Sequence, residues 1–190
     1  MAHEELGPLA ALVGTWEGDE GLDVSYHHAD GAIGDTKYRE RITFSPFGPV
    51  DNGEQCLYGL DYRMAAWRGD EELPFHTEIG YWLWDAGNGQ VMRCFTVPRG
   101  STVIAGGTTT ADARSFRMEA DVGSETYGIL SNQYLDKAAR AVRYECTVTL
   151  VDDDTFTYAE TTTIEHARCD GLLAHTDQNR LRRVSHEVLR

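Results

Sequence analysis

Short hydrophobic stretches and turn sequences alternate along this chain, and that pattern predicts β-strands joined by tight turns. Residues 36–47 (TKYRERITFSPF) and 155–166 (TFTYAETTTIEH) are typical of the stretches, which are rich in Thr, Tyr, Val, Phe and Trp. Between the stretches lie turn sequences such as DAGNG at 85–89 and DDD at 152–154, whose residues tolerate positive φ or favour turns. The pattern predicts about ten or eleven strands.

The connections are so short that consecutive strands are expected to be antiparallel. No long helices alternate with the strands, which argues against a parallel α/β sheet. This many antiparallel strands in one domain must close or stack, because an exposed sheet edge invites aggregation. We therefore predict an all-β fold, a closed antiparallel up-and-down β-barrel of about ten strands. A sandwich of two sheets is the alternative.

The N-terminal region is the one segment with a helical pattern. A short N-terminal helix over residues 5–13 is predicted because its apolar residues recur at helical spacing: Leu6, Leu9, Ala10 and Val13. The whole chain, 1–190, is expected to be a single barrel domain with a tail at 185–190.

Strand alternation predicts which polar side chains point into the barrel. In residues 37–44 the basic face is expected in water, so the other face points inward: Tyr38, Glu40, Ile42 and Phe44. In the last strand the expected inward face is Leu173, His175, Asp177, Asn179 and Leu181. Arg180 and Arg182 then point outward, as do Arg39 and Arg41. Residues 75–84 are apolar on both faces, so alternation alone does not decide whether His76, Glu78 and Trp82 point inward.

Polar groups that point into a barrel need partners, because burying an unpaired polar group costs about 1–3 kcal/mol. Two interpretations of His175, Asp177 and Asn179 follow. They either hydrogen-bond one another as a structural plug at one end of the barrel, or they form the polar contact point of a ligand cavity.

Composition and charge narrow the class of partner. The chain has 190 residues and a formal net charge of −14, with a pI near 4.8, which argues against a nucleic-acid-binding surface. Its apolar runs are far too short to span a membrane, and the N-terminus lacks the pattern of a signal peptide. We therefore expect a cytoplasmic protein without nucleic-acid or membrane partners. The four cysteines are far apart in sequence, which argues against a zinc ribbon.

Three segments resemble a known family, in order and in approximate spacing. They are LVGTWEGDEG at 12–21, FHTEIGYW at 75–82 and HTDQNRLRRV at 175–184. Together they are similar to the nitrobindins and related fatty-acid-binding-protein-like bacterial barrels, and the resemblance covers nearly the whole chain. The resemblance implies a barrel of about ten antiparallel strands with a shallow apolar cavity.

The resemblance also implies a cofactor and an activity. In nitrobindins one histidine near the C-terminus holds a ferric haem b, and such proteins are described as isomerising peroxynitrite to nitrate. His175 would correspond to the ligand of the haem iron, and His76 to a second cofactor-contacting histidine. The ligand pocket would then comprise Glu40, Glu78, Trp82, Asp177, Asn179 and Leu181, while no catalytic residue is assigned.

The chain departs from the family pattern in two places. The family signature is GxWxGxG, whereas Gly21 stands one position late here. His175 also stands farther from Leu181 than the corresponding histidine of haem binders. Because a one-residue slip reverses the face of a strand, His175 reaches a haem site only if the strand accommodates an extra residue.

Two other classes of function compete with haem binding. A haem-free carrier would take a small hydrophobic or amphipathic ligand and meet its carboxylate with an arginine, for which Arg93 and Arg99 are candidates. An enzyme with His76 and Glu78 as its acid/base pair is the other class. The sequence does not decide whether the protein forms a homodimer.

Overall fold

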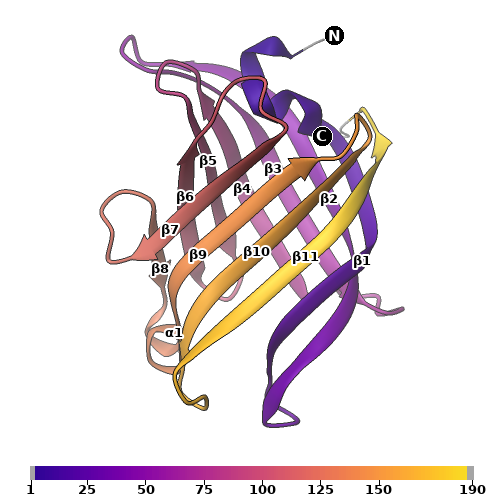
Figure 1. Cartoon of the computed structure of the whole chain (residues 1–190), viewed down its shortest axis with the longest axis vertical. Helices are drawn as coiled ribbons and strands as arrows, with labels where there is room; N and C mark the ends of the chain where they lie inside the picture. The colour runs from indigo at the N-terminus through magenta and orange to yellow at the C-terminus, as the bar shows by residue number, and fades with distance from the viewer. Residues whose placement is uncertain (1–2, 188–190) are drawn as a thin grey trace.

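A computed structural model describes residues 3–187, and in this part of the chain eleven strands form a closed barrel (Figure 1). The predicted all-β closed barrel is confirmed. Its strands are β1 (Gly14–His27), β2 (Ala32–Asp51), β3 (Cys56–Arg68), β4 (His76–Asp85), β5 (Gln90–Val97), β6 (Ser101–Thr108), β7 (Ser115–Val122), β8 (Gly128–Ser131), β9 (Ala139–Leu150), β10 (Thr155–His166) and β11 (Leu172–Ser185). Strands β1 and β11 pair to close the barrel. Because β11 continues to Ser185, the tail predicted at 185–190 begins later, and residues 188–190 lie outside the described residues.

The N-terminal helix, η1 (Glu4–Leu12), covers one end of the barrel (Figure 1). It is a 3-10 helix with a break at Gly7, whose φ of 52° is in the left-handed region. A side chain at Gly7 would also collide with the indole of Trp84. Of the apolar side chains predicted to define this helix, Leu6 and Leu9 are buried, as is Leu12, whereas Ala10 and Val13 are only partly buried against the core. This end of the barrel is therefore sealed by hydrophobic packing.

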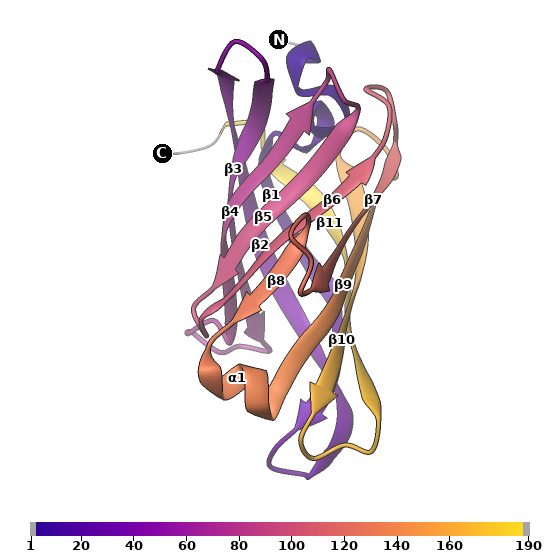
Figure 2. The same ribbon diagram turned by 90° about the vertical axis from the view of Figure 1, so that its left-hand side faces the viewer.

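The strand order departs from a simple up-and-down barrel at β7 and β8. β8 lies between β6 and β7 and pairs with β7 in parallel, through Asp121 with Gly128 and Val122 with Ile129 (Figure 2). The expectation that short connections make all neighbours antiparallel is thus wrong here. The five-residue connection leaves the sheet and returns in the same direction, with positive φ at Gly123 and Tyr127.

A second short helix, α1 (Gln133–Ala138), lies at the end of the barrel away from η1 (Figure 2). Between β7 and β9 only β8 is extended, and the chain enters α1 after Asn132. The Asn132 side chain accepts hydrogen bonds from the backbone N–H groups of Tyr134 and Leu135, which caps the helix. An N-cap asparagine before helix-forming residues is the local signal for this helix.

Strand β1 contains a bulge where the sequence departs from GxWxGxG. Gly18 pairs with Glu40 and Gly21 pairs with Tyr38, so β1 contains one residue more than β2 over this interval. A Cβ atom at Gly21 would lie 2.5 Å from the Tyr38 ring. The pairing of β11 with β10 is regular from Leu172 to Arg182, so β11 has no bulge that would accommodate an extra residue between His175 and Leu181.

Burial confirms the predicted register. Three side chains that alternation or the family resemblance placed inside are buried, namely Phe44, Trp82 and Leu181, and Trp16 of β1 is buried with them. Arg39, Arg41 and Arg182 are exposed as predicted, whereas Arg180 is only half-exposed. Within residues 3–187, neither helix has the length and hydrophobicity that crossing a membrane would require.

Candidate functional site

Polar side chains gather inside the barrel toward the end away from η1. Alternation along β2, β4, β5, β10 and β11 turns them inward among apolar neighbours. They form three hydrogen-bonded groups, centred on Arg93, Glu40 and His175. The interior is therefore apolar beneath η1 and polar toward the opposite end, which we call the polar end.

Arg93 of β5 is the centre of the deepest group and is 2% exposed. Its Nη2 atom lies 2.6 Å from Glu78 Oε2 and donates to Tyr62 Oη at 2.9 Å. Its Nη1 atom pairs with Glu160 and donates to Tyr144 Oη at 2.5 Å. One guanidinium thus holds two buried carboxylates.

The pKa values of the two carboxylates around Arg93, Glu78 and Glu160, shift in opposite directions. Burial raises the pKa of Glu78, but the Arg93 charge and the hydrogen bond from His76 outweigh burial and lower that pKa to about 2. Burial raises the pKa of Glu160, and the attraction of Arg93 does not fully offset it. The Arg93 pKa lies well above its ordinary value, because the surrounding carboxylates outweigh the effect of burial. Glu78 and Glu160 already balance the positive charge of Arg93, so this guanidinium is not available to bind the carboxylate of a ligand.

Glu40 of β2 is at the centre of the second group and is 2% exposed. Tyr158 Oη donates to Glu40 Oε2 at 2.8 Å, and the Tyr38 and Tyr158 hydroxyls lie 2.7 Å apart. Glu40 Oε1 has no hydrogen-bond partner among the described residues. Burial raises the pKa of Glu40 to about 8, with further contributions from the Glu160 and Glu78 charges. Glu40 is therefore mostly protonated near neutral pH.

His76 begins β4 at the polar end. Its Nε2 atom lies 3.0 Å from Glu78 Oε1, and its side chain is 36% exposed. Burial lowers the pKa of His76, but the hydrogen bond to Glu78 outweighs burial and raises it. His76, Glu78 and Trp82 share the inward face of β4, which settles the register that alternation left open.

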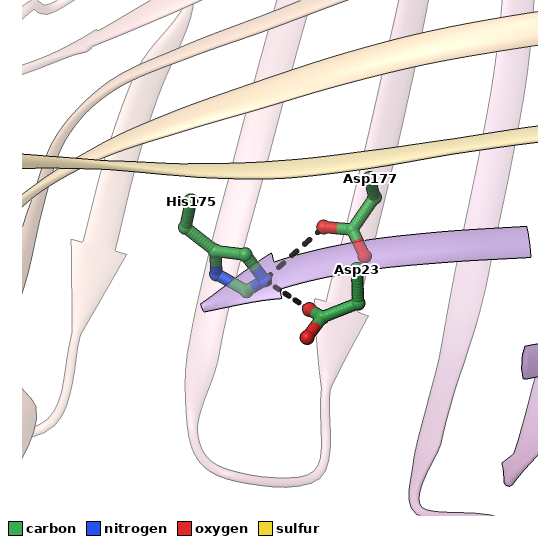
Figure 3. Close-up of side chains that lie close together, drawn as sticks. All are labelled: Asp23, His175 and Asp177. Atoms are coloured by element: carbon green, nitrogen blue, oxygen red, sulfur yellow. Dashed lines mark hydrogen bonds and ion pairs between the residues drawn. The ribbon is translucent and has the colours of Figure 1, made fainter. Parts of the chain in front are cut away.

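His175 of β11 forms the third group with Asp23 of β1 and Asp177 of β11 (Figure 3). Its Nε2 atom lies 2.7 Å from Asp23 Oδ2 and 3.2 Å from Asp177 Oδ2. Asp23 is 7% exposed, whereas the His175 and Asp177 side chains are about one-third exposed. His175 and Asp177 lie on the same face two residues apart, and their side chains are in contact as predicted.

The charge state of His175 follows from these contacts. Burial lowers the pKa of His175, but hydrogen bonds to Asp177 and Asp23 outweigh burial and raise it to about 10. The imidazole is therefore protonated at neutral pH, and the pKa of Asp23 is lowered by its contacts with His175 and Ser25 although burial opposes this.

Little empty space remains between these groups. A cavity of about 10 Å³ lies between Arg93, Glu160, Trp82 and Tyr158, which is about the space of one water molecule. A second hollow, of about 400 Å³, opens on the outside of the barrel near Asp85 and Tyr127. The interior is thus filled mainly by its own side chains.

The predicted site residues fall into more than one group. Glu40, Glu78, Trp82, Asn179 and Leu181 are buried in the interior, whereas His76, His175 and Asp177 are reachable from solvent at the polar end. Arg93 is interior, as the carrier alternative required, and Arg99 is exposed in a turn.

Sequence reasoning missed the partners that hold these residues. Asp23 and Glu160 were not selected, although alternation along β10 places Glu160 on the same face as Phe156 and Tyr158. Asp23 lies directly opposite Asp177 across the β1–β11 pair, beyond the bulge in β1. Because a bulge reverses the face of the residues that follow it, simple alternation from Trp16 fails to place Asp23 inward.

Comparison with known proteins places these features in context. A sequence model of the THAP4-like, heme-binding beta-barrel domain matches residues 5–183. A peroxynitrite isomerase from Clavibacter sepedonicus is 38% identical over 84 residues, which cover 41% of this chain and only 35% of that relative. The crystal structure of Rv2717c from M. tuberculosis superposes with a TM-score of 0.66 at 20% identity, covering 94% of this chain and 96% of that one. At this identity the structural likeness supports the fold alone.

Proposed function

The chain belongs to the THAP4-like, heme-binding beta-barrel family, and from this premise we propose that it is a nitrobindin-like barrel binding a small ligand at its polar end. The other end is sealed by Leu6, Leu9 and Leu12 of η1. The polar end offers the partly exposed side chains of His76 and His175. A few convergent polar groups beside apolar walls are typical of ligand sites.

The ligand that best matches this end is small and carries a positively charged or hydrogen-bond-donating group. One observation carries this proposal: two carboxylates, Asp23 and Asp177, share the single imidazolium of His175. Glu78 and Glu160 are already neutralised in part by Arg93. The site therefore has an excess of negative charge, and oppositely charged ligands are attracted to it.

Haem b is the ligand that the family description suggests, but the His175 imidazole does not fit it. His175 Nε2 is held between two carboxylate oxygens at 2.7 and 3.2 Å, and these leave no room beside the nitrogen for the porphyrin that surrounds a haem iron. His76 Nε2 is likewise hydrogen-bonded to Glu78. The cavity of about 10 Å³ leaves no room for a porphyrin in the interior. The proposed function therefore includes no haem chemistry, and peroxynitrite isomerase describes the relative and not this chain.

Ferric haem titration tests this part of the proposal. Added haem is expected to give no saturable, red-shifted Soret band in the wild-type protein, because the carboxylates beside His175 Nε2 and the filled interior leave no room for a porphyrin. The spectrum of His175→Ala mixed with haem should match that of the wild type. A saturable band that disappears in His175→Ala would contradict the proposal and restore His175 as the haem ligand.

A matched pair of small ligands tests the preference for positive charge. In the presence of EDTA, n-hexylammonium is expected to shift the backbone amide NMR signals of His76, His175 and Asp177 several-fold more than hexanoate at equal concentration and ionic strength. Asp177→Asn should weaken the response to n-hexylammonium. A stronger response to hexanoate, or shifts clustered around Arg93, would instead favour a carrier that recognises a carboxylate.

A further inference from the structure

Asp23, His175 and Asp177 bring three potential metal-binding atoms together at the polar end (Figure 3). The atoms are Asp23 Oδ2, His175 Nε2 and Asp177 Oδ2, and all three lie within 4.8 Å of one another. They come from two directly hydrogen-bonded strands, so a rigid sheet fixes their spacing. The cluster is thus built on the scaffold and not on a mobile loop.

The register of β1 and β11 places two like charges face to face. Asp23 and Asp177 are directly opposite each other in the β1–β11 ladder. Like charges in opposite positions destabilise a sheet unless a cation lies between them. In the structure that cation is the His175 imidazolium, which contacts both carboxylates. Two carboxylates thus face a central position where a cation is favoured, and the protonated Nε2 of His175 occupies that position.

Two of the three distances between these atoms are close to those of ligands around one metal ion. Ligand atoms bound to a single ion at about 2.1 Å lie roughly 3.0–3.4 Å from one another. The distances from His175 Nε2 to Asp23 Oδ2 and Asp177 Oδ2 are 2.7 Å and 3.2 Å, and all three atoms lie within 4.8 Å of one another. An ion that takes the place of the Nε2 proton would thus bind side chains that are already in contact.

The surroundings of the cluster favour a bound ion. Ser25 Oγ donates to Asp23 Oδ1 at 2.6 Å, which orients the carboxylate so that Oδ2 faces His175. Such hydrogen bonds from a second layer of residues commonly position metal ligands. Glu160 lies directly opposite Asp177 on β10 and adds negative charge, while the partly exposed His175 and Asp177 give access from solvent.

We propose that Asp23, His175 and Asp177 bind a first-row divalent metal ion such as Zn²⁺, with water completing its coordination. Binding releases the proton of His175 Nε2 to solvent, and the nitrogen lone pair then bonds to the metal while its oxidation state is unchanged. One imidazole with two carboxylates suits Zn²⁺, Mn²⁺, Fe²⁺ or Co²⁺ better than Ca²⁺ or Mg²⁺, which prefer oxygen ligands throughout. This proposal requires only these three side chains and does not depend on an organic ligand.

Isothermal titration of the chelator-treated, tag-free protein with Zn²⁺ alone is the direct test. One equivalent is expected to bind, and the heat should vary between buffers of different ionisation enthalpy because a proton is released. Co²⁺ should bind at the same site with visible d–d absorption. Asp177→Asn and His175→Gln are each expected to weaken Zn²⁺ binding by at least about tenfold.

A matched control separates this site from other histidines. His28 is exposed, and its ring lies near that of His166 in another cluster, so His28→Gln should leave Zn²⁺ affinity unchanged. Circular dichroism of every variant checks folding, and Asp23→Asn serves if Asp177→Asn does not fold. Failure of the folded wild type to bind one equivalent would overturn the metal proposal and leave a purely structural ion pair. Binding lost in His28→Gln but kept in Asp177→Asn would overturn it as well. Neither outcome bears on the titration with n-hexylammonium in EDTA.

Discussion

Arg93→Met is expected to destabilise the barrel by about 3–5 kcal/mol, because it leaves two carboxylates in the interior without their shared cation. The Arg93 guanidinium contacts Glu78 and Glu160, and these two side chains are 6% and 13% exposed. Methionine keeps much of the length of the side chain and can fill space beside Trp82 and Phe95. The loss therefore reports on charge rather than on volume, and urea unfolding at pH 7 measures it.

A triple variant provides the control for this prediction. Arg93→Met combined with Glu78→Gln and Glu160→Gln removes all three charges, and stability should return to within about 1–2 kcal/mol of the wild type. If Arg93→Met alone were as stable as the wild type, the buried ion pairs would not hold this part of the interior together. If the triple variant were no better than the single one, the loss would come from packing.

Strand patterns predict most of this fold because each strand has one face in the core. Glu40 and Asn179 were placed inside from alternation alone, and both are buried. The same reasoning works for β11 because its pairing with β10 is regular throughout. Where a strand alternates regularly between core and solvent, two residues of known orientation fix all the others.

Alternation fails where the backbone departs from a regular strand. The bulge between Gly18 and Gly21 shifts the register of β1, so regular alternation does not predict that Asp23 lies opposite Asp177. The parallel pairing of β7 with β8 depends on the connection between Val122 and Gly128, whose course no strand pattern specifies. Local backbone geometry decides both cases.

The partners of His175 could not be predicted for a related reason. The sequence places His175 and Asp177 on one face, two residues apart, but the shorter contact is with Asp23, 152 positions earlier in the chain. Only closure of the barrel between its first and last strands brings these residues together. The resemblance to haem-binding barrels implied a free histidine at this place, whereas the pairing across the seam gives that histidine two carboxylate partners.

Glu40→Gln is expected to be more stable than the wild type by a margin that grows as the pH rises from 4.5 to about 8. Burial raises the pKa of Glu40 to about 8 in the folded state, above the ordinary value of 4.5 for a glutamate side chain. The folded protein therefore binds the Glu40 proton more tightly than the unfolded chain does. The stability that this proton contributes is fully present below pH 4.5, and it is lost as the pH rises through about 8.

The stability difference between Glu40→Gln and the wild type should have a defined dependence on pH. Between these two pKa values the wild type should lose about 1.4 kcal/mol per pH unit relative to Glu40→Gln, and above pH 8 the difference should level off. Glutamine is neutral at every pH and can still accept the hydrogen bond from Tyr158 that Glu40 Oε2 accepts now. Urea unfolding of both proteins from pH 5 to about pH 9 measures the difference, and Glu54→Gln in an exposed loop should give a flat one. A stability difference between Glu40→Gln and the wild type that stays the same at every pH would contradict this prediction. It would mean that the folded barrel does not raise the pKa of Glu40, and that Glu40 is ionised in the interior at neutral pH.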